Sequence, residues 1–154
     1  MFYFAYGSNM NHRQMLTERA PGAKFIGLGE LMGYWLVFDG YSSFWRGPVA
    51  NVVKSSDDAV WGGLFEITQE HLEMLDQHEG YPKYYSRMEV SVQRPGREKV
   101  MAWIYLRPAQ VPGRPSGQYL KQILEGAKDC RLPGDYVLST IDIFPEHPLD
   151  PSDF

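Results

Sequence analysis

The acid at position 79 is the strongest candidate for chemistry in this sequence. Glu79 falls four residues after Leu75 and seven after Leu72, which is the spacing of one helix face. A helix that begins after Thr68 would therefore turn Glu79 inward with its apolar neighbours. Burial and the nearby charge of Asp76 would both raise the pKa of Glu79, as a general base at neutral pH requires. The alternative is a frayed helix end with Glu79 in water.

A second candidate is the turn Tyr6-Gly7-Ser8-Asn9, which ends an aromatic run that is typical of a buried strand. Gly7 permits backbone angles closed to other residues, and Ser8 and Asn9 can cap a short helix over residues 10–19. Several backbone N–H groups would then point in one direction. Such a nest binds anions or a carbonyl oxygen. An ordinary connection from strand to helix remains the alternative.

Other familiar kinds of site have weaker support. His71 and His78 are seven residues apart, which puts them two helical turns apart and too far for one metal shell. Ser8 lacks the G-x-S-x-G surroundings of a hydrolase nucleophile. Cys130 fits a packing role better than a nucleophilic one. We therefore expect no bound metal and no covalent intermediate.

Tyrosines are the remaining candidates, and the chain has ten. Tyr85 follows Glu79 closely, Tyr105 falls on an expected strand, and Tyr119 lies in the segment Pro115-Ser116-Gly117-Gln118-Tyr119. Each could equally be a core residue. A buried hydroxyl needs a hydrogen-bonding partner, however, so tyrosines that converge on a polar pocket could bind a small zwitterion.

The elements that must position these residues are short and mostly strands. Glycines at 27, 29 and 33 predict bends or bulges in a strand over residues 24–39. Further strands are expected at 48–54 and 59–67 around a turn at 55–58, and at 83–93 and 98–107 around a turn at 94–97; helices are expected at 68–78, 116–127 and 135–143. The predicted fold class is α+β, a closed or nearly closed mixed β-barrel with flanking helices.

Composition sets outer limits on the function. The 154 residues carry a net charge of −4 with scattered Lys and Arg, so nothing suggests nucleic acid as a partner. The single Cys130 rules out an internal disulfide, and no apolar run reaches the ~18 residues of a membrane span. We expect one cytoplasmic domain over residues 1–144, a monomer or homodimer, with a Pro-rich acidic tail over 145–154.

Three segments together resemble the γ-glutamylcyclotransferase family in their order and spacing. They are Phe4-Ala5-Tyr6-Gly7-Ser8-Asn9, Leu75-Asp76-x-x-Glu79-Gly80 and Pro115-Ser116-x-Gln118-Tyr119. The likeness extends from residue 2 to about residue 140. The turn alone is shared with a wider superfamily, whereas Pro115–Pro133, with its Gly126-Ala127-Lys128 step, is similar to γ-glutamylcyclotransferase proper.

This resemblance implies a cavity at the turn, with Glu79 as the catalytic base and the backbone amides of Tyr6–Asn9 holding a γ-glutamyl group. It also implies that Tyr85, Tyr105 and Tyr119 line the cavity, although the run from Glu79 to Tyr85 is one residue shorter than expected. The implied reaction converts a γ-glutamyl amide to 5-oxoproline and a free amine. The nucleophile is the substrate's own α-amine, so no cofactor is needed.

Two other functions stay open at this point. The enzyme could act on γ-glutamylamines or on a γ-glutamyl-protected biosynthetic intermediate, and the sequence does not separate these leaving groups. The domain could also be a catalytically silent module that binds small metabolites. Keeping a carboxylate at position 79 on an apolar face is costly without a use, which favours an enzyme.

Overall fold

The protein folds as a five-stranded mixed sheet with helices packed along it, seen in a computed structural model that describes residues 1–141. The strands are β1 (Phe2–Ala5), β2 (Lys24–Ser42), β3 (Gly47–Glu66), β4 (Ser86–Val92) and β5 (Val100–Leu106), in the spatial order β2-β3-β1-β5-β4. The shortest strand, β1, therefore lies in the middle. The α+β class predicted from the sequence is confirmed.

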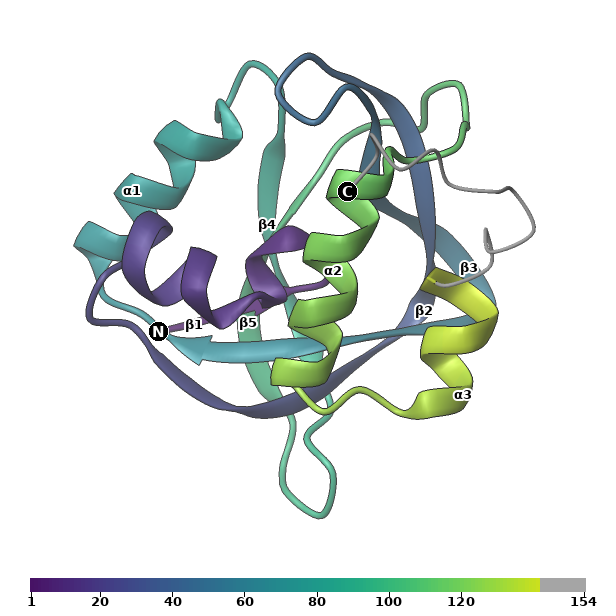
Figure 1. Cartoon of the computed structure of the whole chain (residues 1–154). Coiled ribbons are helices and arrows are strands. Elements are labelled where there is room, and N and C mark those ends of the chain that lie inside the picture. The colour runs from purple at the N-terminus through teal and green to yellow at the C-terminus, as the bar shows by residue number, and fades with distance from the viewer. Residues whose placement is uncertain (142–154) are drawn as a thin grey trace.

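Helical segments follow β1, the β2–β3 hairpin and the β4–β5 hairpin along the chain. They are the 3-10 helix η1 (Ser8–Met10), the π-type helix η2 (Gln14–Arg19), α1 (Gln69–Glu79), α2 (Gly117–Asp129), α3 (Gly134–Tyr136) and the π-type helix η3 (Val137–Ile141). In Figure 1 the green helix α2 lies in front of the sheet, while α1 and the purple N-terminal helical segment lie together at its left side. The expected tail at 145–154 lies outside the described residues.

Strands β2 and β3 form one long antiparallel hairpin with irregular register. Bulges occur at Gly27, at Gly33 and near Gly40, so two of the three glycines named from the sequence mark bulges. The expected turn at 55–58 is wrong. These residues remain within β3 as a wide bulge opposite Gly33, because β2 continues past them and pairs on both sides.

The middle strand joins two hairpins. β1 runs antiparallel to β3, where Phe4 faces Leu64, and parallel to β5, where Tyr3 faces Trp103. β4 and β5 form the second hairpin, as predicted. The expected closed barrel is not confirmed, since β2 and β4 are the two edges of the sheet and meet at a single bridge between Glu30 and Gln93.

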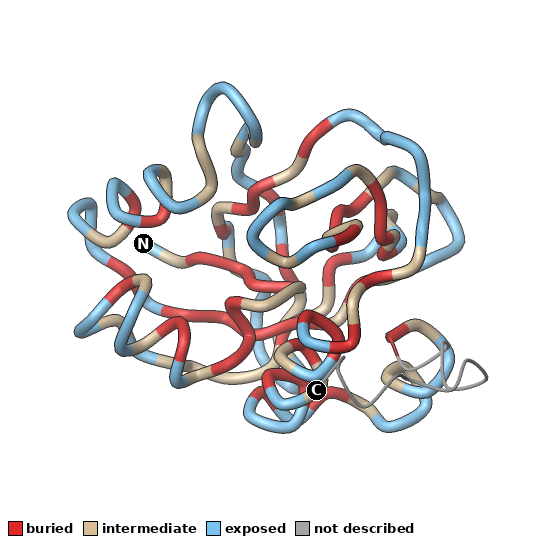
Figure 2. The backbone as a smooth tube through the Cα atoms, turned by 45° about the horizontal axis from the view of Figure 1, so that its top comes forward, coloured by how far each residue is buried: buried red, intermediate tan, exposed pale blue. Residues whose placement is uncertain are grey.

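The core fills the space between the sheet and the helices. Phe4, Leu64 and Phe65 are fully buried along the central strands, and Leu75 and Ile123 reach them from α1 and α2. Figure 2 shows the buried positions concentrated on these inner segments, whereas the loops at the periphery are largely exposed. Burial of this apolar surface, at roughly 25 cal/mol per Å², is the main force that holds the helices on the sheet.

Two of the predicted helix N-caps are present in the structure, and a third is formed by a different residue. Thr68 caps α1 through the backbone N–H of His71, and Ser116 caps α2 through that of Tyr119. Ser8 and Asn9 do not cap residues 10–19, because they are themselves part of η1. Instead, the side chain of Asn11 accepts a hydrogen bond from the backbone N–H of Gln14, at the start of η2.

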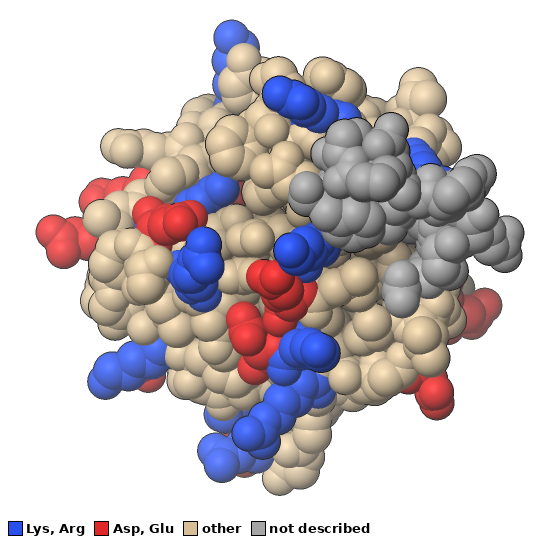
Figure 3. Space-filling model, viewed as in Figure 1, with Lys and Arg blue, Asp and Glu red and all other residues tan. Residues whose placement is uncertain are grey.

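The surface carries both signs of charge without a single-sign field on the face shown. Figure 3 shows Lys and Arg side chains interspersed with Asp and Glu on that face. Among the helices of residues 1–141, none has the length and apolar character that crossing a membrane requires.

Candidate active site

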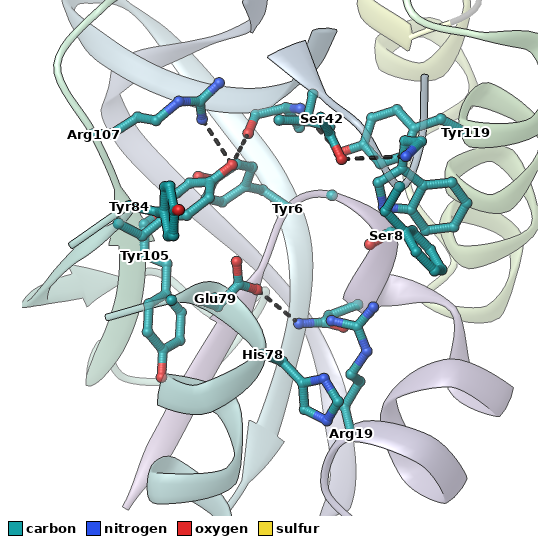
Figure 4. A pocket seen from close by; sticks show the side chains of 18 of the residues that line it. Tyr6, Ser8, Arg19, Ser42, His78, Glu79, Tyr84, Tyr105, Arg107 and Tyr119 are labelled. Atoms are coloured by element: carbon teal, nitrogen blue, oxygen red, sulfur yellow. Dashed lines mark hydrogen bonds between the residues drawn. The ribbon is translucent and has the colours of Figure 1, made fainter. Parts of the chain in front are cut away.

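A cavity of about 880 Å³ opens beside the turn that follows β1, a size typical of small-molecule sites. Its walls come from the turn at 6–9, the end of α1 with the segment after it, the end of β2 with the connection that follows (41–45), and β5; residues of β1, η2, β3 and α2 complete them. Figure 4 shows the side chains that converge there, with Glu79 near the centre.

Glu79 is the last residue of α1, and its side chain points into this cavity. Gly80 ends the helix in the left-handed conformation, with a φ of 68°, which suits glycine because it has no Cβ. Glu79 is half-buried, and its Oε1 accepts a hydrogen bond of 3.3 Å from the side-chain amide of Asn9. The helical spacing therefore predicted the direction of this carboxylate correctly.

Burial raises the pKa of Glu79 from 4.5 to about 7, and the positive charges of Arg19 and Arg107 oppose part of that rise. The expected contribution of Asp76 is wrong. Asp76 pairs with Arg87 at 2.8 Å and accepts the hydroxyl of Tyr105 at 2.7 Å, so its charge is compensated by its own neighbours. Desolvation alone tunes Glu79 toward neutral pH.

The turn after β1 offers two backbone donors. Within the described residues, the N–H groups of Ser8 and Asn9 have no hydrogen-bond acceptor, as at the start of any short helix. Gly7 has a φ of −121°, so it is not needed for a left-handed angle. A Cβ at Gly7 would lie 3.2 Å from that of Ala50 and 3.4 Å from the hydroxyl of Tyr119, and this close approach leaves little room for a side chain.

A chain of side-chain amides supports the contact with Glu79. Asn9 is buried, donates also to the hydroxyl of Tyr3 at 2.9 Å, and accepts a bond of 2.8 Å from Gln14. Gln14 donates to Ser8 Oγ at 2.9 Å and accepts from Gln122 of α2 at 3.0 Å. The orientation of Asn9 is therefore set by helices on either side of it. Gln14 and Gln122 carried no sequence signal for this role.

The tyrosines singled out from the sequence all reach the cavity wall, but their hydroxyls have different partners. Tyr6 donates to the backbone carbonyl of Tyr105 at 2.5 Å, which ties the turn to β5. The hydroxyl of Tyr105 bonds Asp76 and is directed away from Glu79 in Figure 4. These two side chains present mainly ring surface to the cavity.

Tyr85 and Tyr119 meet on opposite sides of one backbone position. The hydroxyl of Tyr119 accepts the N–H of Ala50 at 2.9 Å, and that of Tyr85 donates to the carbonyl of Ala50 at 3.4 Å. Arg107 donates to the hydroxyl of Tyr85 at 2.7 Å. Burial raises the pKa of both tyrosines above its usual range, so both remain neutral donors at physiological pH.

Behind Tyr85 lies a buried ion pair that sequence reasoning missed. Arg107 Nη2 lies 2.6 Å from Asp39 Oδ1, and both side chains are almost inaccessible to water. Asn51 donates to Asp39 at 3.3 Å and to the carbonyl of Arg107 at 2.9 Å. Asp39 and Arg107 are 68 positions apart and lie on different hairpins, so no local pattern could have joined them.

The mouth of the cavity has an aromatic rim. Tyr41 at the end of β2 is 73% exposed, Phe44 in the connection to β3 is 71% exposed, and Tyr84 is 68% exposed. Large aromatic rings exposed together at a cavity mouth offer a contact surface for part of a ligand. Sequence reasoning gave these aromatic residues no role.

His71 and Cys130 have structural contacts, whereas His78 lines the cavity. His71 completes the cap of α1 by accepting the N–H of Thr68, and its other ring nitrogen lies 2.7 Å from the carbonyl of Pro21. Cys130 is buried and donates to the carbonyl of Met10. Across residues 1–141, no three His, Cys, Asp or Glu side chains gather into a group that could hold a metal ion.

Known proteins share this fold and much of this sequence. A model of the AIG2-like family matches residues 59–139. γ-Glutamylcyclotransferases of Homo sapiens and Mus musculus are 34% and 33% identical over 143 residues, covering 87% of this chain and 73% of each relative. A solved γ-glutamyl cyclotransferase superposes with a TM-score of 0.85 at 28% identity, covering 99% of this chain and 94% of that one.

These matches place the chain in the class of proteins with an AIG2-like fold. Within that class, the chain belongs to the γ-glutamylcyclotransferase family.

Proposed function

We propose that this protein is a γ-glutamylcyclotransferase, which converts γ-glutamyl amino acids to 5-oxoproline and a free amino acid. The proposal depends most on one observation: Glu79 reaches into the cavity with a pKa raised to about 7, beside the N–H groups of Ser8 and Asn9, which have no acceptor among residues 1–141. That combination supplies a base and oxyanion donors at neutral pH. The family's characterised relatives carry the same activity in their names.

The reaction needs only atoms of the substrate and one proton carrier. The α-ammonium, with a pKa around 8 in peptides, gives a proton to Glu79. The free amine attacks the γ-carbonyl carbon and forms the ring C–N bond, and its nitrogen then releases a second proton to solvent, which leaves the neutral amide N–H of the ring. The C–N bond to the leaving amine breaks as Glu79 returns its proton to that nitrogen, and the released amine takes up the remaining proton from solvent. Glu79 is therefore a base in the first half and an acid in the second.

Positioning supplies the rest of the rate enhancement. Folding the glutamyl chain so that its nitrogen meets its own γ-carbonyl can be worth ~10⁵ M or more in effective concentration. The N–H groups of Ser8 and Asn9 would stabilise the oxyanion, and the surfaces of Tyr6, Tyr85 and Tyr119 would enclose the glutamyl chain. Because the nucleophile belongs to the substrate, the chemistry has no step that requires a metal ion or cofactor.

The metabolic context, cellular location and oligomeric state form the rest of the proposal. γ-Glutamyl amino acids are small zwitterions of the kind produced and consumed in glutathione metabolism, and we place the enzyme in the cytoplasm on the basis of its lone cysteine. A monomer or homodimer is sufficient, since the turn, the base and the tyrosines come from one chain.

The direct test is a coupled assay for 5-oxoproline with a panel of γ-glutamyl compounds. We expect γ-glutamyl dipeptides of small neutral amino acids to react fastest and glutathione to react more slowly, because its extra glycine must fit past the aromatic rim. Activity should survive dialysis against EDTA. Loss of activity on dialysis, restored by zinc or manganese, would contradict the metal-free mechanism.

The same panel separates the two other functions. Turnover of γ-glutamylamines alone would indicate a different leaving group within the superfamily. No turnover of any member by folded protein would indicate a binding module.

A further inference from the structure

The cavity contains a second arginine with no assigned role. Arg19, the last residue of η2, lines the cavity and reaches toward it beside His78 in Figure 4. Within the described residues, its guanidinium has no hydrogen-bond or ion-pair partner. Arginine side chains that line pockets and lack a protein partner are well suited to bind carboxylates in two parallel hydrogen bonds.

The other arginine of the cavity is not available for this task. Arg107 is held by Asp39 at 2.6 Å and by the hydroxyl of Tyr85 at 2.7 Å, so its charge is already compensated. Glu79 lies near enough to feel both cations, yet it forms no ion pair with either within the described residues. Among residues 1–141, Arg19 is thus the cavity-lining arginine that has no such partner.

The substrate has two carboxylates, and neither takes part in the proposed proton transfer. A γ-glutamyl amino acid carries an α-ammonium, the glutamyl α-carboxylate and the carboxylate of the leaving amino acid. Glu79 faces the ammonium, and the turn at 6–9 holds the glutamyl half. The leaving carboxylate must then be desolvated near the mouth, which is costly unless a cation meets it.

We infer that Arg19 binds the carboxylate of the leaving amino acid and so makes the enzyme selective for γ-glutamyl amino acids over γ-glutamylamines. This inference rests on the proposed function, because it names the part of the substrate that this side of the cavity recognises. Arg19 is a specificity residue and takes no part in proton transfer. Its contribution is uniform binding, which changes KM more than kcat.

Two substrates that differ only in this carboxylate test the inference. γ-Glutamyl-alanine and γ-glutamyl-alaninamide have the same size and the same scissile bond. Wild-type protein should prefer the acid by ~10-fold or more in kcat/KM, since a hydrogen-bonded charge is lost in the amide. This comparison needs no variant, so it holds even if substitutions impair folding. Equal kcat/KM values for the two compounds would overturn the inference.

Variants at position 19 sharpen the test. Arg19→Gln should lower kcat/KM for the acid by ~10–100-fold, mainly through KM, and leave the amide nearly unchanged. Arg19→Lys should recover part of the loss, because a cation remains without the planar fork. The matched control is Arg13→Gln, the same change of charge at an exposed position just before η2.

The outcomes separate this inference from the function beneath it. An equal loss of kcat/KM on both substrates would mean that Arg19 binds the glutamyl half, and no loss on either would mean that it binds no part of the substrate. Both results would overturn the inference. Turnover by the wild-type protein would still support the proposed enzyme. Failure of wild-type protein to release 5-oxoproline from either compound would instead remove the proposed function itself.

Discussion

Asp39 and Glu79 are two carboxylates at the same end of the molecule, and the protein treats them in opposite ways. Asp39 is 1% exposed, pairs with Arg107, and accepts further bonds from Asn51 and the backbone of Gln110. Glu79 receives one long hydrogen bond from Asn9, although two arginines lie nearby. A carboxylate with several donors keeps its charge and holds structure together, whereas one with few donors can exchange a proton.

Removal of the loosely held carboxylate should have the largest effect on activity. Glu79→Gln keeps the shape of the side chain but cannot accept the proton of the substrate amine. We expect kcat to fall by roughly 10²–10⁴-fold with little change in KM. Release of 5-oxoproline under saturating γ-glutamyl-alanine measures this. A variant that retains most of the wild-type rate would refute the proposed base.

The tightly held pair should matter most for stability. Arg107→Met leaves Asp39 buried without its cation, which costs about 3–5 kcal/mol of unfolding free energy. Urea denaturation of the variant, with Arg97→Met at an exposed turn as the control, gives the value. A loss of unfolding free energy below about 1 kcal/mol would show that the ion pair is dispensable. It would also contradict the structural role that distinguishes Asp39 from Glu79.

Glu79 should also cost stability when it is ionised. Its folded pKa of about 7 is higher than the unfolded value of 4.5, so the folded state binds the proton more tightly, and stability falls as pH rises from 4.5 to 7. At pH 8, Glu79→Gln should therefore be more stable than wild type by up to ~3 kcal/mol. The gap should close below pH 4.5. A variant that is less stable than wild type at pH 8 would contradict this.

The smallest effect is expected from Asp76, which lies three residues before Glu79. For wild type, kcat/KM should fall as pH drops through about 7, where Glu79 gains its proton. Asp76→Asn should leave that midpoint unmoved, because Arg87 already compensates the charge of Asp76. The variant should lose only ~0.2–1 kcal/mol of stability. A midpoint displaced clearly downward would restore Asp76 as a cause of the raised pKa.

Local sequence signals predicted the parts of this site that local interactions determine. The caps at Thr68 and Ser116 and the inward direction of Glu79 follow from residue types at helical spacing. The hairpin of β4 and β5 follows from alternation around a short turn. In each case the residues that form the pattern belong to one continuous stretch of sequence, so the pattern is visible without knowledge of distant contacts.

The rest of the site depends on contacts between distant residues. Neither the pairing of Asp39 with Arg107 nor the place of Arg19 in the cavity wall has a local pattern. The polar run at 55–58 has turn composition, but it does not start a new hairpin, because β2 pairs with the residues on both sides of it. Glycine positions predicted where β2 would bulge, yet they could not tell whether the sheet would close, because closure depends on how two edge strands approach.

The central place of β1 bears on how the pocket assembles. β1 is made first, but its neighbours in the sheet, around Glu66 and Trp103, are made much later. The cavity beside the turn at 6–9 is therefore incomplete until β5 and α2 have packed against the rest of the fold. Contacts between residues so far apart in the sequence form slowly. The pocket and the fold should then be gained and lost together. A ligand that fills the cavity will consequently slow proteolysis along the whole chain, far from the residues it touches.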